Sequence, residues 1–322
     1  MSDAAFCLDE ILPLSLFAEL TDVRLKQAGE LREHAQRRQR RYELTNDGKL
    51  VILAADHPAR MVTGALGDPL ALGNRREYLG RILRVLTGNA VDGLMGTPDI
   101  IEEALALDML GQQAGEAPLL DDKLLIGCMN RGGLAGTVFE MRDAFTAYDG
   151  QWLRAMNLDG AKLMFRLDPD DPDSGRTIEW GARAVNDCLD HDLPVFIEPL
   201  LVKKQGGKYV VQKDAASLTK ISGVAAALGR CSLNTWLKLP YGPNYDQVAL
   251  STTCPILMLG GEAVGDPLPL LRDIEQGMRS GANVRGALIG RNVLFPGAQD
   301  PLQMARAVSR IVHEGVAAAA AL

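Results

Sequence analysis

The chain has 322 residues, and 47% of them are hydrophobic, which is enough to bury a sizeable core in one large α/β domain or two smaller ones. Its net charge of −7 argues against a general nucleic-acid-binding protein, and no apolar run of about 18 residues predicts a membrane span. The amino terminus lacks the basic and apolar regions of a secretory signal, and the five cysteines are scattered without a C-x-x-C pair. We therefore expect a cytoplasmic protein with reduced thiols.

Residues 1–48 are predicted to form a helical N-terminal extension. Apolar residues between 11 and 31 have roughly helical spacing, and Thr21-Asp22 is a candidate cap for a second helix that runs to about residue 41. The basic run RRQRR at 37–41 has two interpretations, a contact to a phosphate or a solvated helix face, and we favour the solvated face.

From residue 49 onward, short apolar runs alternate with amphipathic segments or polar loops. The predicted strands are Leu50–Ala55, Val91–Met95, Lys123–Met129, Gly160–Phe165, Pro194–Glu198, Thr235–Leu239, Pro255–Leu259 and Gly286–Ile289. The predicted helices are Asn74–Thr87, Pro98–Ala114, Met141–Asn157, Thr177–His191, Asp214–Leu228, Tyr245–Ser251, Pro269–Ser280 and Pro301–Glu314. Eight such units over about 270 residues predict a (β/α)8 TIM barrel as the catalytic domain, residues 49–322. A doubly wound open sheet is the alternative, and it is weakened because no G-x-G-x-x-G follows the first strand.

The predicted strand at 235–239 carries a single lysine. Alternate side chains of a strand share a face, so Trp236, Lys238 and Pro240 point one way and Leu237 and Leu239 the other. Burial and a nearby cation both lower the pKa of a lysine, and a neutral amine can attack a carbonyl to form a Schiff base. An isolated lysine of this kind is more often part of a structural ion pair, so the interpretation depends on the other strands.

Polar residues at the carboxyl ends of the other strands form a coherent set, because the chemistry of TIM barrels lies at that end. Asp56 and His57 follow the first strand, Lys162 lies on the fourth, and Glu198 ends the fifth. Lys162 and Lys238 could both project into the barrel, where two ammonium groups cannot both stay protonated cheaply, so one pKa is expected to fall. Asp56 and Glu198 would balance the remaining charge and move protons, as a Schiff-base aldolase requires. His57 would either touch the substrate or form a hydrogen bond behind it.

The last two predicted strands offer a candidate phosphate site, which in this fold is frequent at these strand ends. Gly260 and Gly261 would let backbone N–H groups approach an anion, and Arg291 supplies a planar, permanently charged fork. A glycine pair alone also makes an ordinary turn, so this prediction depends on Arg291. The four histidines show no metal-binding motif and no G-x-S-x-G elbow is present, so we expect neither a metal nor another cofactor, and no serine hydrolysis.

Six stretches across about residues 49–296 together resemble class I (Schiff-base) aldolases, the superfamily of tagatose-bisphosphate, sulfofructose-phosphate and deoxyribose-phosphate aldolases. They read LAADHPAR, GAKLMFRLDPDDP, VFIEPLL, WLKLPY, LMLGGE and ALIGRNV. The resemblance implies that Lys238 forms the Schiff base, that Lys162 and Glu198 assist proton transfer, and that Asp56 binds substrate hydroxyls. It also implies that Gly260, Gly261 and Arg291 hold phosphate.

The chain departs from that family after the first strand. The family follows the first-strand aspartate with glutamine and arginine, whereas this chain has His57-Pro58-Ala59-Arg60, so the residues that would meet the far end of the sugar differ. The chain also resembles aldolases encoded among inositol-degradation enzymes, whose substrate would be a phosphorylated deoxy-keto-gluconic acid.

The sequence thus predicts a metal-independent aldolase, a carbon–carbon lyase that reversibly cleaves a phosphorylated ketose or keto-sugar acid to dihydroxyacetone phosphate and an aldehyde. The expected partners are the phosphorylated sugar and further copies of the chain in a homo-oligomer, with neither nucleic acid nor membrane. Two alternatives are a metal-dependent lyase or isomerase and a non-catalytic barrel that binds sugar phosphates, because one fold hosts many functions.

Overall fold

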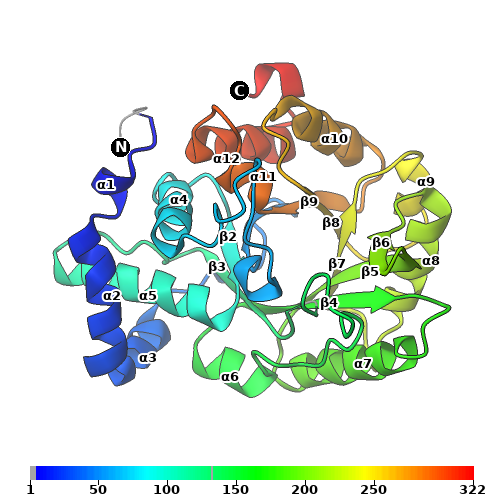
Figure 1. Cartoon of the computed structure of the whole chain (residues 1–322), viewed down its shortest axis with the longest axis horizontal. Helices are drawn as coiled ribbons and strands as arrows, with labels where there is room; N and C mark the ends of the chain where they lie inside the picture. Colours follow the sequence, from blue (N-terminus) through cyan, green and yellow to red (C-terminus); the bar gives the residue numbers. More distant parts are fainter. Residues whose placement is uncertain (1–4, 132) are drawn as a thin grey trace.

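The computed structural model of the protein describes residues 5–131 and 133–322. Within these residues, eight parallel strands close into a barrel (Figure 1). They are β1 (Leu50–Ala55), β2 (Gly93–Gly96), β3 (Leu124–Cys128), β4 (Gly160–Leu167), β5 (Val195–Gln205), β7 (Thr235–Pro240), β8 (Ile256–Leu259) and β9 (Val284–Ile289). Pairing of β1 with β9 and of β4 with β5 closes the ring, which confirms the predicted TIM barrel and makes the open sheet wrong.

Helices surround the barrel between the strands (Figure 1). They are α4 (Arg75–Thr87), α5 (Pro98–Gln113), α6 (Gly150–Ala155), α7 (Ser174–Asp190), α8 (Ala215–Ala226), α9 (Tyr245–Ala249), α10 (Leu268–Arg279), α11 (Arg291–Leu294) and α12 (Pro301–Ser309). Side chains of Asn74, Asp149 and Asp214 accept hydrogen bonds from the backbone of the first turn of α4, α6 and α8, as good N-caps do. No helix within the described ranges is long and apolar enough to cross a membrane.

The N-terminal extension lies beside α4 and α5 as three helices, α1 (Leu8–Ile11), α2 (Leu14–Lys26) and α3 (Ala28–Arg37) (Figure 1). Thr21-Asp22 lies inside α2, so its prediction as a helix cap is wrong, and the break between the two longer helices falls at Gln27. A buried contact of 2.7 Å between His34 Nε2 and Asp108 Oδ2 ties α3 to α5. The first four residues of the predicted 1–48 extension lie outside the described part of the chain.

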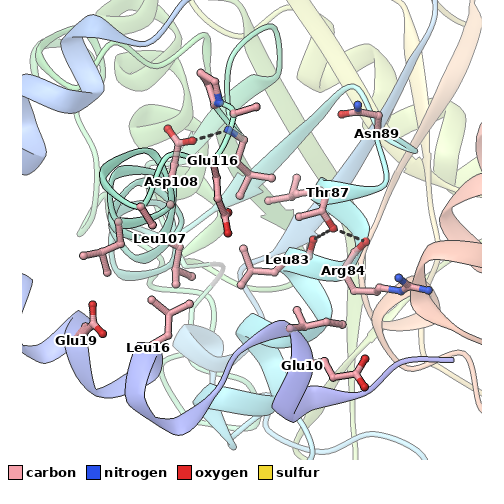
Figure 2. A pocket seen from close by; sticks show the side chains of 18 of the residues that line it. Glu10, Leu16, Glu19, Leu83, Arg84, Thr87, Asn89, Leu107, Asp108 and Glu116 are labelled. Atoms are coloured by element: carbon pink, nitrogen blue, oxygen red, sulfur yellow. Dashed lines mark hydrogen bonds between the residues drawn. The ribbon is translucent and has the colours of Figure 1, made fainter. Parts of the chain in front are cut away.

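A groove of about 890 Å³ lies between α1 and α2 on one side and α4 and α5 on the other (Figure 2). It is lined by leucines from α2, α4 and α5, among them Leu16, Leu83 and Leu107. The carboxylates of Glu19 and Glu116 also line the groove. None of the residues predicted for the active site lines this groove.

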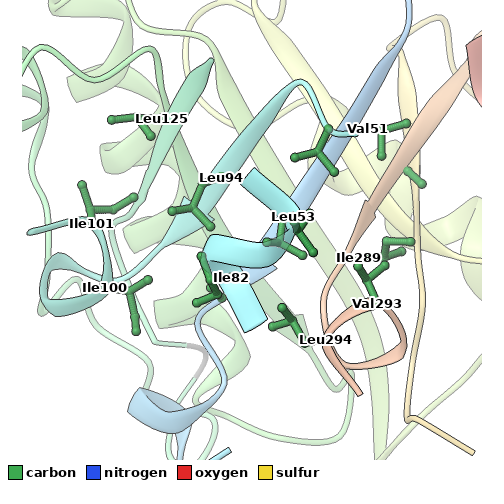
Figure 3. Close-up of a cluster of buried hydrophobic side chains, with 14 of the residues drawn as sticks. Val51, Leu53, Ile82, Leu94, Ile100, Ile101, Leu125, Ile289, Val293 and Leu294 are labelled. Carbon is green, nitrogen blue, oxygen red and sulfur yellow. The ribbon is translucent and has the colours of Figure 1, made fainter. Parts of the chain in front are cut away.

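The outer faces of the strands pack against the helices. Figure 3 shows Val51 and Leu53 of β1 and Leu94 of β2 in one cluster with Ile82 of α4 and Ile101 of α5. The strand residues between these outward-facing ones point into the barrel and fill its interior on the amino-terminal side of the mouth, the name we give to its carboxyl-terminal end. This inner cluster comprises Leu50, Ile52, Ala54, Met95, Leu124, Ile126, Cys128, Phe196, Trp236, Leu257 and Leu288. The predicted facing of Trp236 inward and of Leu237 outward is therefore confirmed.

The basic run at 37–41 is a solvated helix face only at Arg37, which ends α3 with a 68% exposed side chain, and that prediction is wrong for the three arginines that follow it. Nη2 of Arg38 and Nε of Arg40 lie 2.7 and 2.6 Å from the two carboxylate oxygens of Asp159, and Arg41 Nη1 lies 3.0 Å from Asp92. Arg38 also donates to the Lys123 carbonyl at 2.8 Å. Because these partners directly precede β2, β3 and β4, the run closes the amino-terminal end of the barrel.

Two further expectations need correction in the loops. The predicted helix 141–157 is helical only at Gly150–Ala155, which Asp149 caps, and Met141 packs outside any helix against Met164 and Val202. The fifth strand continues beyond the predicted Glu198 and returns as an antiparallel strand, β6 (Lys208–Val211), through Gly206-Gly207, both at positive φ. Among the described residues, two short α-helices are additional to the prediction, α1 (Leu8–Ile11) in the extension and α11 (Arg291–Leu294) directly after β9, and the other predicted strands and helices follow one another in the predicted order.

Candidate active site

Four of the predicted residues meet inside the mouth, the carboxyl-terminal end of the barrel: Lys162, Glu198 and Lys238 come from β4, β5 and β7, and Asp56 directly follows β1. Lys162 Nζ lies 3.1 Å from Asp56 Oδ2 and 2.9 Å from Glu198 Oε2. Lys238 Nζ contacts the same Glu198 oxygen at 2.9 Å. No side chain of the four is more than 7% exposed, so the contacts form a buried chain that runs Lys238, Glu198, Lys162, Asp56.

The two lysines are placed in different electrostatic environments. Burial lowers the pKa of Lys238 below its usual value, and the charge of Lys162 adds to this effect although Glu198 opposes it. Burial also disfavours the charge of Lys162, but Asp56 and Glu198 both contact it and raise its pKa above the usual range. One of the paired lysines is thus displaced toward the neutral amine, as the sequence predicts, and that lysine is Lys238.

Both carboxylates of the chain stay ionised despite their burial. Burial by itself would raise the pKa of Asp56, but Lys162 and Arg60 hold it well below the usual value. Burial acts in the same direction on Glu198, whose pKa the two lysines lower. Glu198 is therefore held in the form that can accept a proton, in contact with Lys238 Nζ, and its low pKa favours passing that proton on.

His57 lies next to Asp56, with its Nδ1 4.0 Å from Asp56 Oδ1 and 3.4 Å from the hydroxyl of Tyr78 on α4. Burial lowers the pKa of His57 to about 3, so the imidazole is neutral. Gly290 lies against the ring, and any side chain there would collide with the ring and with the Ala54 carbonyl. The neutral ring can donate or accept one hydrogen bond at the mouth, which is compatible with both predicted roles of His57.

The predicted phosphate residues lie together at the ends of β8 and β9. Gly261 has φ of +68°, a conformation that glycine adopts without strain, and the Gly260 carbonyl accepts a hydrogen bond of 2.6 Å from Asn292 Nδ2. Arg291 Nη1 lies 3.9 Å from Glu262, and its buried Nε has no hydrogen-bond partner within the described residues. The sequence did not single out Asn292, which holds the glycine loop beside Arg291.

The sequence analysis gave no role of their own to two arginines at the mouth, although it placed Arg60 in the segment that would meet the far end of the sugar. Arg60, in the 3-10 turn Pro58–Arg60, places Nη1 3.5 Å from Asp56 Oδ2. Arg166 lies on β4, four residues beyond Lys162 and hence on the same inward face, and its Nη2 is 3.2 Å from Glu140. The period-two alternation of the fourth strand was the available signal for Arg166. For Arg60 the signal was a basic residue four positions after a candidate catalytic aspartate.

The side-chain amide of Asn130, which lies two residues beyond β3, bonds to the backbone in the middle of β4. Asn130 Oδ1 accepts from the Met164 N–H, and Asn130 Nδ2 donates to the Met164 carbonyl, both at 2.8 Å. Nδ2 also donates to Asp143 at 3.1 Å. In the described part of the chain, no three His, Cys, Asp or Glu side chains are grouped to hold one metal ion.

Comparison with known proteins assigns the chain to a family. A sequence profile described as Cgl0159-like matches residues 48–312. The crystal structure of Cgl0159 from Corynebacterium glutamicum is 35% identical to this chain, with a TM-score of 0.87 over 95% of this chain and 99% of that chain.

More distant relatives share the barrel. The structure of an archaeal fructose 1,6-bisphosphate aldolase matches with a TM-score of 0.60 at 20% identity, over 88% of this chain and 100% of that chain. A Schiff-base-forming fructose-1,6-bisphosphate aldolase matches similarly, with a TM-score of 0.59 at 21% identity and the same coverage. At these identities the likeness shows the common fold. An uncharacterised aldolase from Saccharolobus solfataricus is 29% identical over 128 residues, which is 39% of this chain and less than half, 43%, of that relative.

Proposed function

This chain belongs to the Cgl0159-like family, and we propose that it is a class I aldolase whose Schiff base forms on Lys238. The observation that carries the proposal is the pair of buried lysines that share one oxygen of Glu198. Lys162 is held charged by two carboxylates, whereas Lys238 has one carboxylate and a neighbouring cation, which favours the neutral nucleophile. The likeness in fold to aldolases that form Schiff bases supports the same proposal.

Formation of the Schiff base uses the groups in contact with Lys238. Its neutral Nζ adds to the ketone carbon of the substrate, and a proton passes from nitrogen to the carbonyl oxygen, which gives a carbinolamine. Glu198 is placed to carry this proton, because its Oε2 touches Nζ. A further proton converts the hydroxyl into leaving water and leaves an iminium, while Lys162 keeps the site positively charged and Glu198 ionised.

Cleavage of the carbon–carbon bond needs a base at the hydroxyl beyond the scissile bond. In the proposed mechanism the Asp56 carboxylate binds that hydroxyl and accepts its proton, so the bond breaks, an aldehyde leaves and the electron pair of the broken bond moves to the iminium nitrogen, which gives an enamine. The enamine carbon is then protonated, and water hydrolyses the resulting iminium to release the ketone product and free Lys238.

The substrate in this proposal is a phosphorylated ketose or keto-sugar acid, and the ketone product is dihydroxyacetone phosphate. The loop at Gly260-Gly261 and the guanidinium of Arg291 support a phosphate at the β8 and β9 ends, because the buried Nε of Arg291 lacks a partner that an anion could supply.

Borohydride trapping tests the function directly. The protein is incubated with dihydroxyacetone phosphate, reduced and digested, and the modified peptide is identified by mass spectrometry. We expect one adduct, on Lys238, which disappears in Lys238→Met and persists in Lys220→Met, a matched change of an exposed lysine on α8.

Two results would count against this proposal in different ways. An adduct on Lys162 would exchange the roles of the two lysines. Absence of any adduct with dihydroxyacetone phosphate and with longer ketose phosphates would overturn the aldolase function itself.

A further inference from the structure

The ladder of hydrogen bonds between β3 and β4 is completed by a side chain. Its last backbone register pairs Cys128 with Lys162, and the Met129 N–H donates to the Lys162 carbonyl at 2.9 Å. In an unbroken parallel ladder the Met129 carbonyl would then accept from the Met164 N–H. Asn130 makes this rung instead, because its Oδ1 accepts from the Met164 N–H and its Nδ2 donates to the Met164 carbonyl. An N–H must face an oxygen, so the orientation of the buried amide is fixed.

Asn130 makes the rung because the chain leaves β3 at this point and enters the β3–α6 loop. The Met129 carbonyl is used within that loop, where it accepts from the N–H groups of Thr146 and Ala147 at 3.2 and 3.1 Å. Asn130 Nδ2 also donates to Asp143 Oδ2 of the same loop at 3.1 Å. One amide therefore joins the loop at the mouth to β4.

The backbone that Asn130 holds lies between two of the proposed catalytic groups. Lys162 is two residues before Met164 on the same face of β4, and Glu198 is the register partner of Met164 on β5. Lys162 Nζ lies 2.9 Å from Glu198 Oε2, and Lys238 Nζ contacts the same oxygen at 2.9 Å. A displacement of Met164 would therefore move Lys162 and Glu198 relative to Lys238, which lies on β7.

We propose that Asn130 is a positioning residue for the aldol reaction, because its amide replaces the backbone rung at Met164 and so keeps Lys162 and Glu198 in contact beside Lys238. This inference rests on the aldolase function proposed above. Asn130 acts through the strand, and the proton transfers remain with the lysines and Glu198. Proton transfer between groups held at hydrogen-bond distance is sensitive to small displacements, and a misplacement of about 1 Å can cost roughly 100-fold in rate.

The first test removes the amide. Asn130→Ala is assayed with dihydroxyacetone phosphate and the preferred aldehyde, which is the one turned over fastest from a panel of neutral and phosphorylated aldehydes. We expect kcat per folded molecule to fall roughly 10- to 100-fold. The half-saturating dihydroxyacetone phosphate concentration should change less than about threefold, because the proposed phosphate site at Gly260, Gly261 and Arg291 belongs to the ends of β8 and β9.

Asn130→Asp separates positioning from packing, because it keeps the shape of the side chain. One carboxylate oxygen can still accept from the Met164 N–H, but the other faces the Met164 carbonyl and Asp143, and only a protonated carboxyl can donate to them. Burial raises the pKa of Asp143, and a second carboxyl beside it favours a shared proton. The neighbouring cations, which oppose this effect, are Arg166, Lys162 and Arg60.

The aspartate variant should therefore make activity depend on pH in a new way. At pH 5.5 we expect kcat of Asn130→Asp within about threefold of the unmodified protein, and at pH 8 roughly 10-fold or more below it. Asn130→Ala should show the same loss relative to the unmodified protein at both pH values, because it carries no titrating group.

The matched control is another amide that bonds to backbone carbonyls, at the opposite end of the barrel. Asn283 Nδ2 donates to the carbonyls of Ala249 and Thr252 at 3.0 and 2.8 Å. Asn283→Ala should lower the midpoint of urea unfolding, as Asn130→Ala should, but leave kcat per folded molecule unchanged.

Borohydride trapping on Lys238 separates failure of this inference from failure of the aldolase function. Absence of an adduct in the unmodified protein is a failure of the function. In protein that traps dihydroxyacetone phosphate, an unchanged kcat in Asn130→Ala, or an equal loss of kcat in Asn283→Ala, would overturn the inference. If Asn130→Ala does not fold, Asn130→Asp decides, because a ratio of its kcat to that of the unmodified protein that is independent of pH would contradict the positioning role.

Discussion

The two ends of the barrel both contain buried ionic clusters, and they differ in what the charges are tied to. At the amino-terminal end, Asp159 and Asp92 each accept a backbone N–H at 2.7 Å, from Leu125 and Val51, in addition to their arginines. At the mouth, Lys162 Nζ and Lys238 Nζ instead contact the same carboxylate oxygen of Glu198. Carboxylates that also bind backbone N–H groups, as Asp159 and Asp92 do, stabilise the fold. Side chains whose main partners are other charged side chains, as at the mouth, can exchange those partners for a substrate.

The largest expected effect comes from a substitution that disrupts the ionic cluster at the mouth and leaves the cluster at the amino-terminal end of the barrel unchanged. Glu198→Gln keeps the size of the side chain but removes the charge that two lysines share, so kcat/KM for the aldol reaction should fall roughly 100- to 10,000-fold. Steady-state kinetics with the preferred aldehyde measures this, and Glu179→Gln, an exposed glutamate of α7 paired with Arg183, is the control. Activity within a factor of about three of the original would contradict the role of Glu198.

The corresponding substitution in the other cluster, at the amino-terminal end of the barrel, is expected to change stability and not activity. Asp159→Asn removes the charge that Arg38 and Arg40 share, and leaving one member of a buried ion pair unpaired typically costs about 3–5 kcal/mol. We expect urea unfolding to show a loss of this size, with kcat per folded molecule unchanged. A loss of activity in fully folded protein would mean that the two clusters are not independent.

The smallest expected effect concerns pH and the histidine of the amino-terminal end. His313 contacts Asp47 at 2.9 Å and Asp92 at 3.1 Å, and its hydrogen bond to Asp92 is the main reason that its pKa is raised, although burial opposes this. A raised folded-state pKa stabilises the protein fully below the unfolded value of about 6.5, and this stabilisation is lost as pH rises through the folded value.

His313→Gln should therefore lower the free energy of unfolding at pH 5.5 by about 1 kcal/mol and change it less at pH 9. Urea unfolding at both pH values measures this, with His191→Gln as a matched control. A loss that is equal at both pH values would indicate that packing, and not charge, explains the contribution of His313.

The period-two alternation of side chains along a strand made the lysines of the mouth predictable. Residues outside the strands, such as Arg38 and Arg60, follow no such alternation, and their contacts were not predicted. Lys162 and Lys238 were found because an inward-facing strand position in a parallel barrel fixes where a side chain goes. Arg38 was misjudged because its partner, Asp159, is 121 residues away, and a local run of like charge carries no information about it. Arg60 lies in a 3-10 turn, where no strand periodicity applies, so its direction depended on the folded loop.

The contacts at the amino-terminal end of the barrel pair segments that are synthesised first with segments that are synthesised last. Lys49 donates to the Val312 carbonyl and His313 binds Asp47, across sequence separations of 263 and 266 residues, and β1 pairs with β9. During synthesis on the ribosome, the first strand is therefore made long before its last neighbour. Until the ninth strand emerges, β1 and β8 present open edges, the kind of surface that pairs with other chains. The nascent protein is exposed to aggregation for nearly its whole translation, and a chain truncated by a few dozen residues would retain that exposure permanently.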